Sequence, residues 1–281
     1  ERKAIFKVHT KNLKYDDKQV DLEFLSKQTP GFSGADIANL CNEAALIAAR
    51  NNKRIIEKQD FLDAVDRIIG GLEKKNKIIK PREKKTIAYH EAGHASVSWL
   101  LEHANPLVKV TIVPRGQALG AAWYLPEERQ ITTKARLLDQ MVSLLGGRAA
   151  EELVFGEVST GALNDLERVT KQAYAMVVYY GLDKEIGNLS FYDSSGQSEY
   201  GFQKPFSEKT AEKIDAQIRT MVEEAYEKAK SLLKDNREKL DALAQILVER
   251  EVIFREDVEA IYGPRPWDAE TEIKKEEIEI K

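Results

Sequence analysis

Two histidines and a glutamate, His90, Glu91 and His94, form the pattern H-E-x-x-H. On a helix, residues four apart lie about 5–6 Å from each other on one face, so both imidazoles can bind one metal ion. Zn²⁺ is the ion that this spacing favours, and a neighbouring glutamate can take a proton from a water molecule that the metal activates. The pattern therefore predicts metal-assisted hydrolysis, with His90 and His94 as ligands and Glu91 as the general base.

Accident is the alternative explanation of this pattern. The chain has 4 histidines among 281 residues, and such frequencies produce the motif by chance in roughly half a per cent of sequences of this length. The two histidines would then be core residues satisfied by hydrogen bonds. The helical context favours the metal site, because Ile87, Val97 and Leu101 recur with the histidines at spacings of three and four and place them on an inward-facing stripe.

A catalytic zinc ion needs a third protein ligand and one position open to water. The extended motif with a third histidine is absent, and His103 falls where the helix should already have ended. A carboxylate is therefore expected, and the candidates are Glu151, Glu152 and Asp165. Spacing alone does not choose among them, because an acid such as Asp165 in the first turn of a helix also stabilises the helix dipole.

The metal motif lies on a helix predicted from Pro81 through Leu101, since proline suits the first turn of a helix. Two short β-rich runs flank Pro114-Arg115-Gly116 and predict a small hairpin. Glycines are interpreted as helix stops. The expected segments are strands at 108–113 and 119–125, helices at 133–145 (stopped by Gly146-Gly147) and 164–180 (stopped by Gly181), and a long helix pair within 207–251.

A separate group of helices precedes the metal motif. Ser33-Gly34-Ala35-Asp36 reads as a capping box that opens a helix running to Asn51-Asn52, and shorter helices are predicted at 20–28 and 59–69. The fold class is mainly α. Four parts are expected: a compact helical unit at 1–72, a charged linker at 73–80, a mostly helical domain with a small β-sheet at 81–263, and a flexible charged tail at 264–281.

Composition narrows the possible functions. The net charge of −4, from 43 basic and 47 acidic residues, argues against binding to nucleic acid. No run approaches the ~18 apolar residues of a membrane helix, and the N-terminus lacks the apolar core of a signal peptide. The single cysteine, Cys41, cannot form an internal disulfide, which favours a reducing compartment.

Four motifs follow one another along the second part of the chain: Y-H-E-A-G-H-A at 89–95, I-V-P-R-G at 112–116, L-G-G-R-A-A-E-E at 145–152 and S-T-G-A-L-N-D-L at 159–166. Together they resemble the peptidase domain of the FtsH family, the membrane-anchored AAA+ zinc proteases of bacteria, mitochondria and chloroplasts. The sequence P-G-F-S-G-A-D-I at 30–37 is similar to the helical lid of that family's ATPase module. The resemblance covers nearly the whole chain up to about Pro266.

The resemblance implies roles for individual residues. It implies one Zn²⁺ per chain, held by His90, His94 and Asp165, with Glu91 as the general base. In the lid, three residues match positions on the nucleotide side: His9, Gly34 and Ala35.

The resemblance also implies that the chain is the C-terminal part of a longer polypeptide. The phosphate-binding pattern G-x-x-x-x-G-K-[ST] does not occur in the sequence, so ATP or ADP with Mg²⁺ would bind only in the full-length parent. That parent would be a homo-hexamer, anchored through an N-terminal part, that degrades unfolded or membrane proteins processively. The expected location is a bacterial inner membrane with this part on the cytoplasmic face, or else a mitochondrial or chloroplast membrane.

The expected function is therefore zinc-dependent hydrolysis of peptide bonds. The run 119–125 is either a strand edge to which an extended peptide adds through main-chain hydrogen bonds or a plain buried strand. Two other functions compete: a ring-forming scaffold or peptide-binding module with a structural zinc, and an ATPase lid attached to an inactive domain. Glu91 argues against both, because a structural site needs no base beside an open coordination position.

Overall fold

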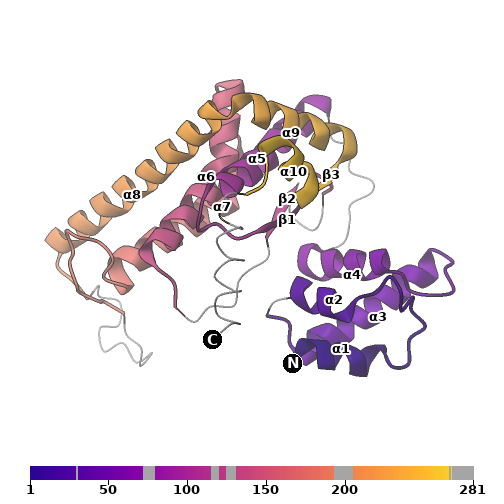
Figure 1. Ribbon diagram of the computed structural model, residues 1–281. Helices are drawn as coiled ribbons and strands as arrows, with labels where there is room; N and C mark the ends of the chain where they lie inside the picture. The colour runs from indigo at the N-terminus through magenta and orange to yellow at the C-terminus, as the bar shows by residue number, and fades with distance from the viewer. Residues whose placement is uncertain are drawn as a thin grey trace, which may run out of the picture. The chain divides into compact units, whose positions relative to one another are not determined.

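The computed structural model describes residues 1–29, 31–71, 80–114, 120–124, 131–192, 205–265 and 267. The fold is mainly helical and divides into two compact units, one built from α1 to α4 and the other from α5 to α10 with three short strands (Figure 1). Among the described residues, no helix combines the length and the apolar character needed to span a membrane.

The first unit is a small bundle with its own core. Its helices are α1 (Arg2–Thr10), α2 (Leu22–Gln28), α3 (Gly34–Arg50) and α4 (Lys58–Gly70). The predicted capping box is confirmed: the Ser33 hydroxyl accepts from the Asp36 N–H at 3.3 Å, and the Asp36 carboxylate accepts from the Ser33 N–H at 2.8 Å. The sequence did not predict α1, which contributes the fully buried Phe6 to the core. Pro30 and the charged linker, apart from Lys80, lie outside the described residues.

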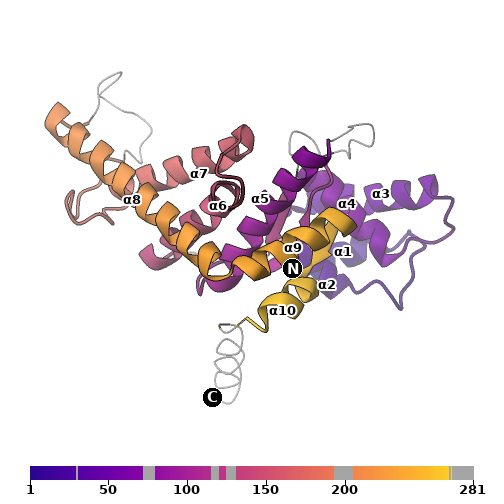
Figure 2. The same ribbon diagram turned by 90° about the horizontal axis from the view of Figure 1, so that it is seen from above.

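The second unit is organised around α5 (Pro81–Leu100), which lies between α6 and α9 (Figures 1 and 2). Every residue from Ile87 to Trp99 is buried, so the helix is enclosed on all sides rather than along the single stripe that its sequence predicted. The other helical segments are α6 (Lys134–Phe155), η1 (Thr160–Ala162), α7 (Leu163–Tyr174), η2 (Ala175–Tyr179), α8 (Glu208–Asp235), α9 (Arg237–Arg250) and α10 (Arg255–Tyr262).

The β-structure is larger than the predicted hairpin. Strands β1 (Leu107–Thr111) and β2 (Ala121–Tyr124) are neighbours, as expected, but β3 (Val252–Phe254) pairs antiparallel with the other side of β1 and gives the order β2-β1-β3. Three residues are too few to show the alternating pattern of a strand, which is why β3 escaped prediction. The tight turn expected between β1 and β2 falls largely on residues 115–119, outside the described residues.

The predicted stop of α6 at Gly146-Gly147 is wrong, because the helix continues to Phe155 and ends at Gly156, whose φ is +68°. The glycine pair serves helix packing instead. A Cβ on Gly93 of α5 would lie 2.3 Å from the Gly146 carbonyl oxygen, and a Cβ on Gly146 would lie 2.7 Å from the Gly93 oxygen. Backbone therefore touches backbone at this crossing, and no side chain fits between the two helices.

Two further segments differ in detail from the predictions. The helix expected at 164–180 ends as the π-helical turn η2, followed by Gly181 with a φ of +60°. The segment after α10 is not loose throughout, because Arg265 is buried and donates to the carbonyl oxygens of Leu101 at 2.8 Å and Ala104 at 2.6 Å. Most of the predicted tail, residues 266 and 268–281, lies outside the described residues.

Candidate metal centre

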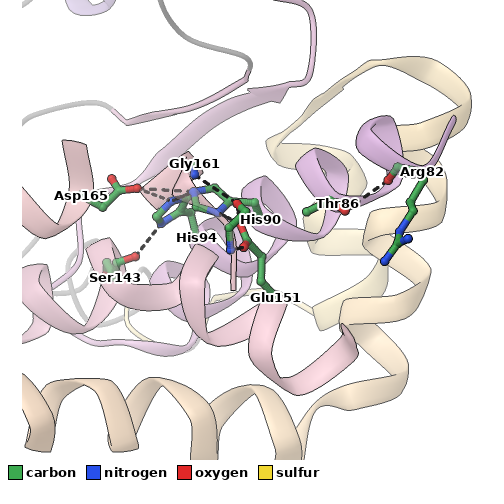
Figure 3. A network of polar contacts seen from close by, with 9 residues as sticks. Arg82, Thr86, His90, His94, Ser143, Glu151, Gly161 and Asp165 are labelled. Atoms are coloured by element: carbon green, nitrogen blue, oxygen red, sulfur yellow. Dashed lines mark hydrogen bonds and ion pairs between the residues drawn. The ribbon is translucent and has the colours of Figure 1, made fainter. Parts of the chain in front are cut away.

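The two histidines of the motif are held by the same neighbouring helix (Figure 3). His90 Nδ1 donates to the Glu151 carboxylate at 2.7 Å, and His94 Nδ1 donates to the Ser143 carbonyl oxygen at 2.9 Å. Both partners belong to α6. These bonds place the proton on Nδ1 of each ring, so that both Nε2 atoms carry a lone pair for a metal.

Asp165 completes a cluster with the two Nε2 atoms. Its Oδ2 lies 3.4 Å from His90 Nε2 and 3.4 Å from His94 Nε2, and the two nitrogens are 3.1 Å apart. Ligand atoms 2.0–2.1 Å from a tetrahedral zinc ion lie about 3.4 Å from one another. The three donor atoms thus form a triangle of the size that one zinc ion requires, and their chemistry, two imidazoles and a carboxylate, suits this metal.

The charges of the cluster favour a cation. Burial alone would raise the pKa of Asp165, but when no metal is bound the adjacent imidazoles of His90 and His94, in their protonated form, outweigh this effect and hold the pKa well below its usual range. Burial would conversely lower the pKa of His90, yet Asp165 and Glu151 overcome burial and raise it. Because these carboxylates stabilise positive charge on the imidazoles, they also stabilise a divalent ion between them.

Glu91 lies on the same turn of α5 and is 7% exposed. Burial raises the pKa of its carboxyl group, against the opposing influence of His94 and His90. The backbone N–H of Ala122 on β2 faces this carboxylate and acts in the opposite direction, favouring its charged form. Sequence reasoning did not anticipate that contact, since nothing in the spacing relates the strand to the motif.

The three candidate carboxylates occupy different places. Asp165 lies in the first turn of α7, as a dipole-stabilising acid would, and also reaches the imidazoles. Glu151 is 2% exposed and contacts His90 Nδ1, on the side of the ring away from Asp165, so it supports a candidate ligand rather than facing the metal position itself. Glu152 points elsewhere and bonds to Tyr226 and Lys230 of α8.

The three residues expected on the nucleotide side of the lid lie in the first unit. His9 is exposed near the end of α1. Gly34 opens α3, and a Cβ placed on it would lie 4.0 Å from Ile5 of α1, one helical turn before His9. Ala35 is exposed beside it. The fold thus brings the start of α3 to the face of α1 that carries His9, and among the described residues no group of His, Cys, Asp and Glu side chains that could hold a metal ion lies there.

Comparison with known proteins agrees with this geometry. The model of peptidase family M41 matches residues 77–261, and the model of the AAA+ lid domain matches residues 19–63. The first match includes all three candidate ligands and Glu91. The chain belongs to peptidase family M41.

Relatives of this M41 chain carry consistent names. It is 65% identical over 267 residues to the ATP-dependent zinc metalloprotease FtsH of Parabacteroides distasonis, covering 95% of the chain and 39% of the relative. It is 56% identical to the FtsH of Karelsulcia muelleri, over 93% of the chain and 42% of the relative. A mouse mitochondrial inner membrane m-AAA protease component is 48% identical, over 95% of this chain and 34% of the relative. The chain therefore spans only about two fifths of its bacterial relatives.

Proposed function

We propose that this chain is the zinc endopeptidase part of an ATP-dependent protease and that it hydrolyses peptide bonds in unfolded polypeptides. The observation that carries the proposal is the triangle of His90, His94 and Asp165 donor atoms, 3.1–3.4 Å on each side, next to the buried Glu91. The names of its relatives, which are zinc metalloproteases, support the same reaction.

The chain's own residues would divide the chemistry among them. Zn²⁺ bound at this centre would polarise the scissile carbonyl group and make water a stronger nucleophile. Glu91 would accept a proton from the attacking water and return it to the leaving amine. The Ala122 N–H would keep the carboxylate oriented meanwhile.

The position of β2 supports binding of an extended peptide. The strand stands at one end of the order β2-β1-β3, and its Ala122 contacts the general base. A substrate that adds alongside β2 through main-chain hydrogen bonds would pass close to Glu91. Such contacts involve the backbone rather than side chains, which would suit broad choice of sequence.

The remaining expectations concern the parent protein and are proposals as well. We infer that residues 1–72 serve as the lid of an AAA+ module, that residues 81–263 form the peptidase domain, and that residues 73–80 link them. His9, Gly34 and Ala35 would face ATP or ADP with Mg²⁺ in the parent. The parent would assemble as a homo-hexamer anchored in a membrane; the name of the mouse relative places that protein in an inner membrane. For a bacterial parent, the cytoplasmic face is the proposed side.

Metal analysis combined with a peptidase assay tests the reaction. A short unstructured fluorogenic peptide is the appropriate substrate, because its cleavage requires no unfolding by an ATPase. Purified chain should bind one zinc per molecule and cleave the peptide, and a chelator should abolish cleavage. Glu91→Gln should keep its zinc yet lose roughly 10²–10⁴-fold in rate. Glu83→Gln, an exposed acid on the same helix, is the matched control and should leave the rate unchanged. Full activity in Glu91→Gln would refute the proposed base.

A further inference from the structure

One face of α6 touches both imidazoles of the metal motif. Ser143, Gly147 and Glu151 follow one another at intervals of four residues, so they lie in a row along that face. The Ser143 carbonyl oxygen and the Glu151 carboxylate accept hydrogen bonds from His94 and His90 at the two ends of this row. Gly147 lies between them.

Gly147 is in unusually close contact with the rings. A Cβ on this residue would lie 2.5 Å from His90 Nε2, 2.6 Å from His90 Cε1 and 2.6 Å from His94 Nε2. Carbon and nitrogen atoms that are not bonded to each other normally stay about 3.5 Å apart. The backbone of α6 therefore comes so near to the imidazoles that no side chain fits, and its helical conformation does not itself demand glycine.

We propose that Gly147 is a positioning residue of the metal centre: the absence of its side chain lets both Nε2 atoms lie at ligand positions while Ser143 and Glu151 hold the rings. This inference rests on the zinc site proposed above. To reach even 3.0 Å from an added methyl group, the nitrogens would have to move by about 0.4–0.5 Å. A zinc–ligand bond tolerates only about 0.2 Å, so the displaced rings could not hold the ion as before.

The adjacent Gly146 provides a contrast because its neighbours are of another kind. A Cβ there would meet the backbone of Gly93 at 2.7 Å and the Cα of His94 at 3.2 Å. Backbone cannot yield without separating α5 from α6, whereas imidazoles can rotate away. Substitution of Gly146 should therefore damage the fold itself, and substitution of Gly147 should damage metal binding.

The test compares Gly147→Ala, Gly146→Ala and the unchanged chain in zinc affinity, by competition with a chromophoric chelator, and in melting temperature in EDTA. Gly147→Ala should bind zinc roughly 10–100-fold more weakly, the loss typical of disturbing a ligand's support. Its melting temperature in EDTA should fall less than that of Gly146→Ala, since the imidazoles can shift while the helix backbones stay in place and alanine favours a helix interior over glycine. Gly146→Ala should melt at a lower temperature in EDTA.

Three results would overturn the inference. Zinc affinity in Gly147→Ala within twofold of the unchanged chain would show that the rings accommodate the methyl group. A fall in its EDTA melting temperature as large as that of Gly146→Ala would assign Gly147 to helix packing alone. Failure of the unchanged chain to bind zinc would instead refute the metal centre on which the inference rests. Zinc binding by the unchanged chain therefore distinguishes a failure of the proposed function from a failure of the inference about Gly147.

Discussion

Replacement of Glu151 by glutamine tests whether the metal centre depends on a residue that binds no metal. The Glu151 carboxylate accepts from three donors: His90 Nδ1 at 2.7 Å, the Ser159 N–H at 2.6 Å and the Ser159 hydroxyl at 3.0 Å. Ser159 begins the turn that leads into α7 and Asp165. One carboxylate thus joins a proposed ligand on α5 to the segment that positions Asp165, the proposed third ligand, and Glu151→Gln should weaken zinc binding.

The size of the effect follows from the count of donors and acceptors. Glutamine keeps the shape of the side chain but replaces one acceptor oxygen with an NH₂ group, which cannot accept. Whichever way the amide turns, the N–H of buried His90 or that of exposed Ser159 faces it without an acceptor, and the bonds that remain are no longer made to a charged group. A hydrogen bond to a charged group is worth about 1.5–3 kcal/mol, and tenfold in affinity corresponds to about 1.4 kcal/mol. Zinc affinity should therefore fall roughly 10–100-fold, in agreement with the usual effect of a residue that supports a ligand.

Glu152→Gln is the matched control, since it makes the same chemical change one residue further along α6. Glu152 bonds to Tyr226 and Lys230 rather than to a histidine. The zinc affinity of Glu152→Gln should therefore stay within about twofold of that of the unchanged chain. Chelator competition at fixed pH measures all three proteins. Equal affinities for Glu151→Gln and the unchanged chain would refute the reasoning, and so would an equal loss in both variants.

Other side chains give independent tests. Asp165→Asn should lower zinc affinity and peptidase rate together, by ~100-fold or more for loss of a charged ligand; undiminished zinc content on metal analysis would place the third ligand elsewhere. Arg265→Ala removes charged hydrogen bonds to the carbonyl oxygens of Leu101 and Ala104, which are worth about 1.5–3 kcal/mol. The melting temperature measured by calorimetry should therefore fall by ~3–12 °C, and an unchanged value would contradict this packing. Burial raises the pKa of the Cys41 thiol to about 11, so iodoacetamide at pH 8 should label Cys41 only after denaturation. The free energy of unfolding should also decline from about pH 9 to 11, because the thiol ionises in the unfolded chain before it does in the folded one. Rapid labelling of folded protein would refute its burial.

Local features of the fold were readable from the sequence. The capping box at Ser33 involves groups three residues apart, and Pro81 begins α5 where a first-turn proline belongs. The helix pair within 207–251 was found by its apolar spacing. By contrast, β3 has three residues and exists because β1 offers it a partner. Its formation depends on residues more than a hundred positions away, and no local pattern contains that information.

In the metal site, too, some residues could be predicted from local spacing and others depend on how the helices pack. His90, Glu91 and His94 are one helical turn apart, so their geometry follows from the helix alone. Asp165 could not be chosen over Glu151 by spacing, because both are acids on helical segments and only the packing of α5, α6 and α7 decides which one meets the Nε2 side of the ring. The family resemblance favours Asp165, and in the structure its Oδ2 lies 3.4 Å from both Nε2 atoms.

The glycine pair of α6 shows why one residue type supports opposite predictions. Glycine ends helices because it adopts positive φ readily, and it also permits close approach because it has no Cβ. Gly156 does the first, with a φ of +68°, whereas Gly146 and Gly147 do the second. What distinguishes them is the opposite surface: α5 lies so close to α6 that a Cβ on Gly146 would strike backbone and one on Gly147 would strike the imidazoles. The crossing of α5 and α6 therefore sets both the packing of the unit and the positions of the two imidazoles proposed as ligands, so changes that separate these helices should weaken zinc binding even where they touch neither histidine.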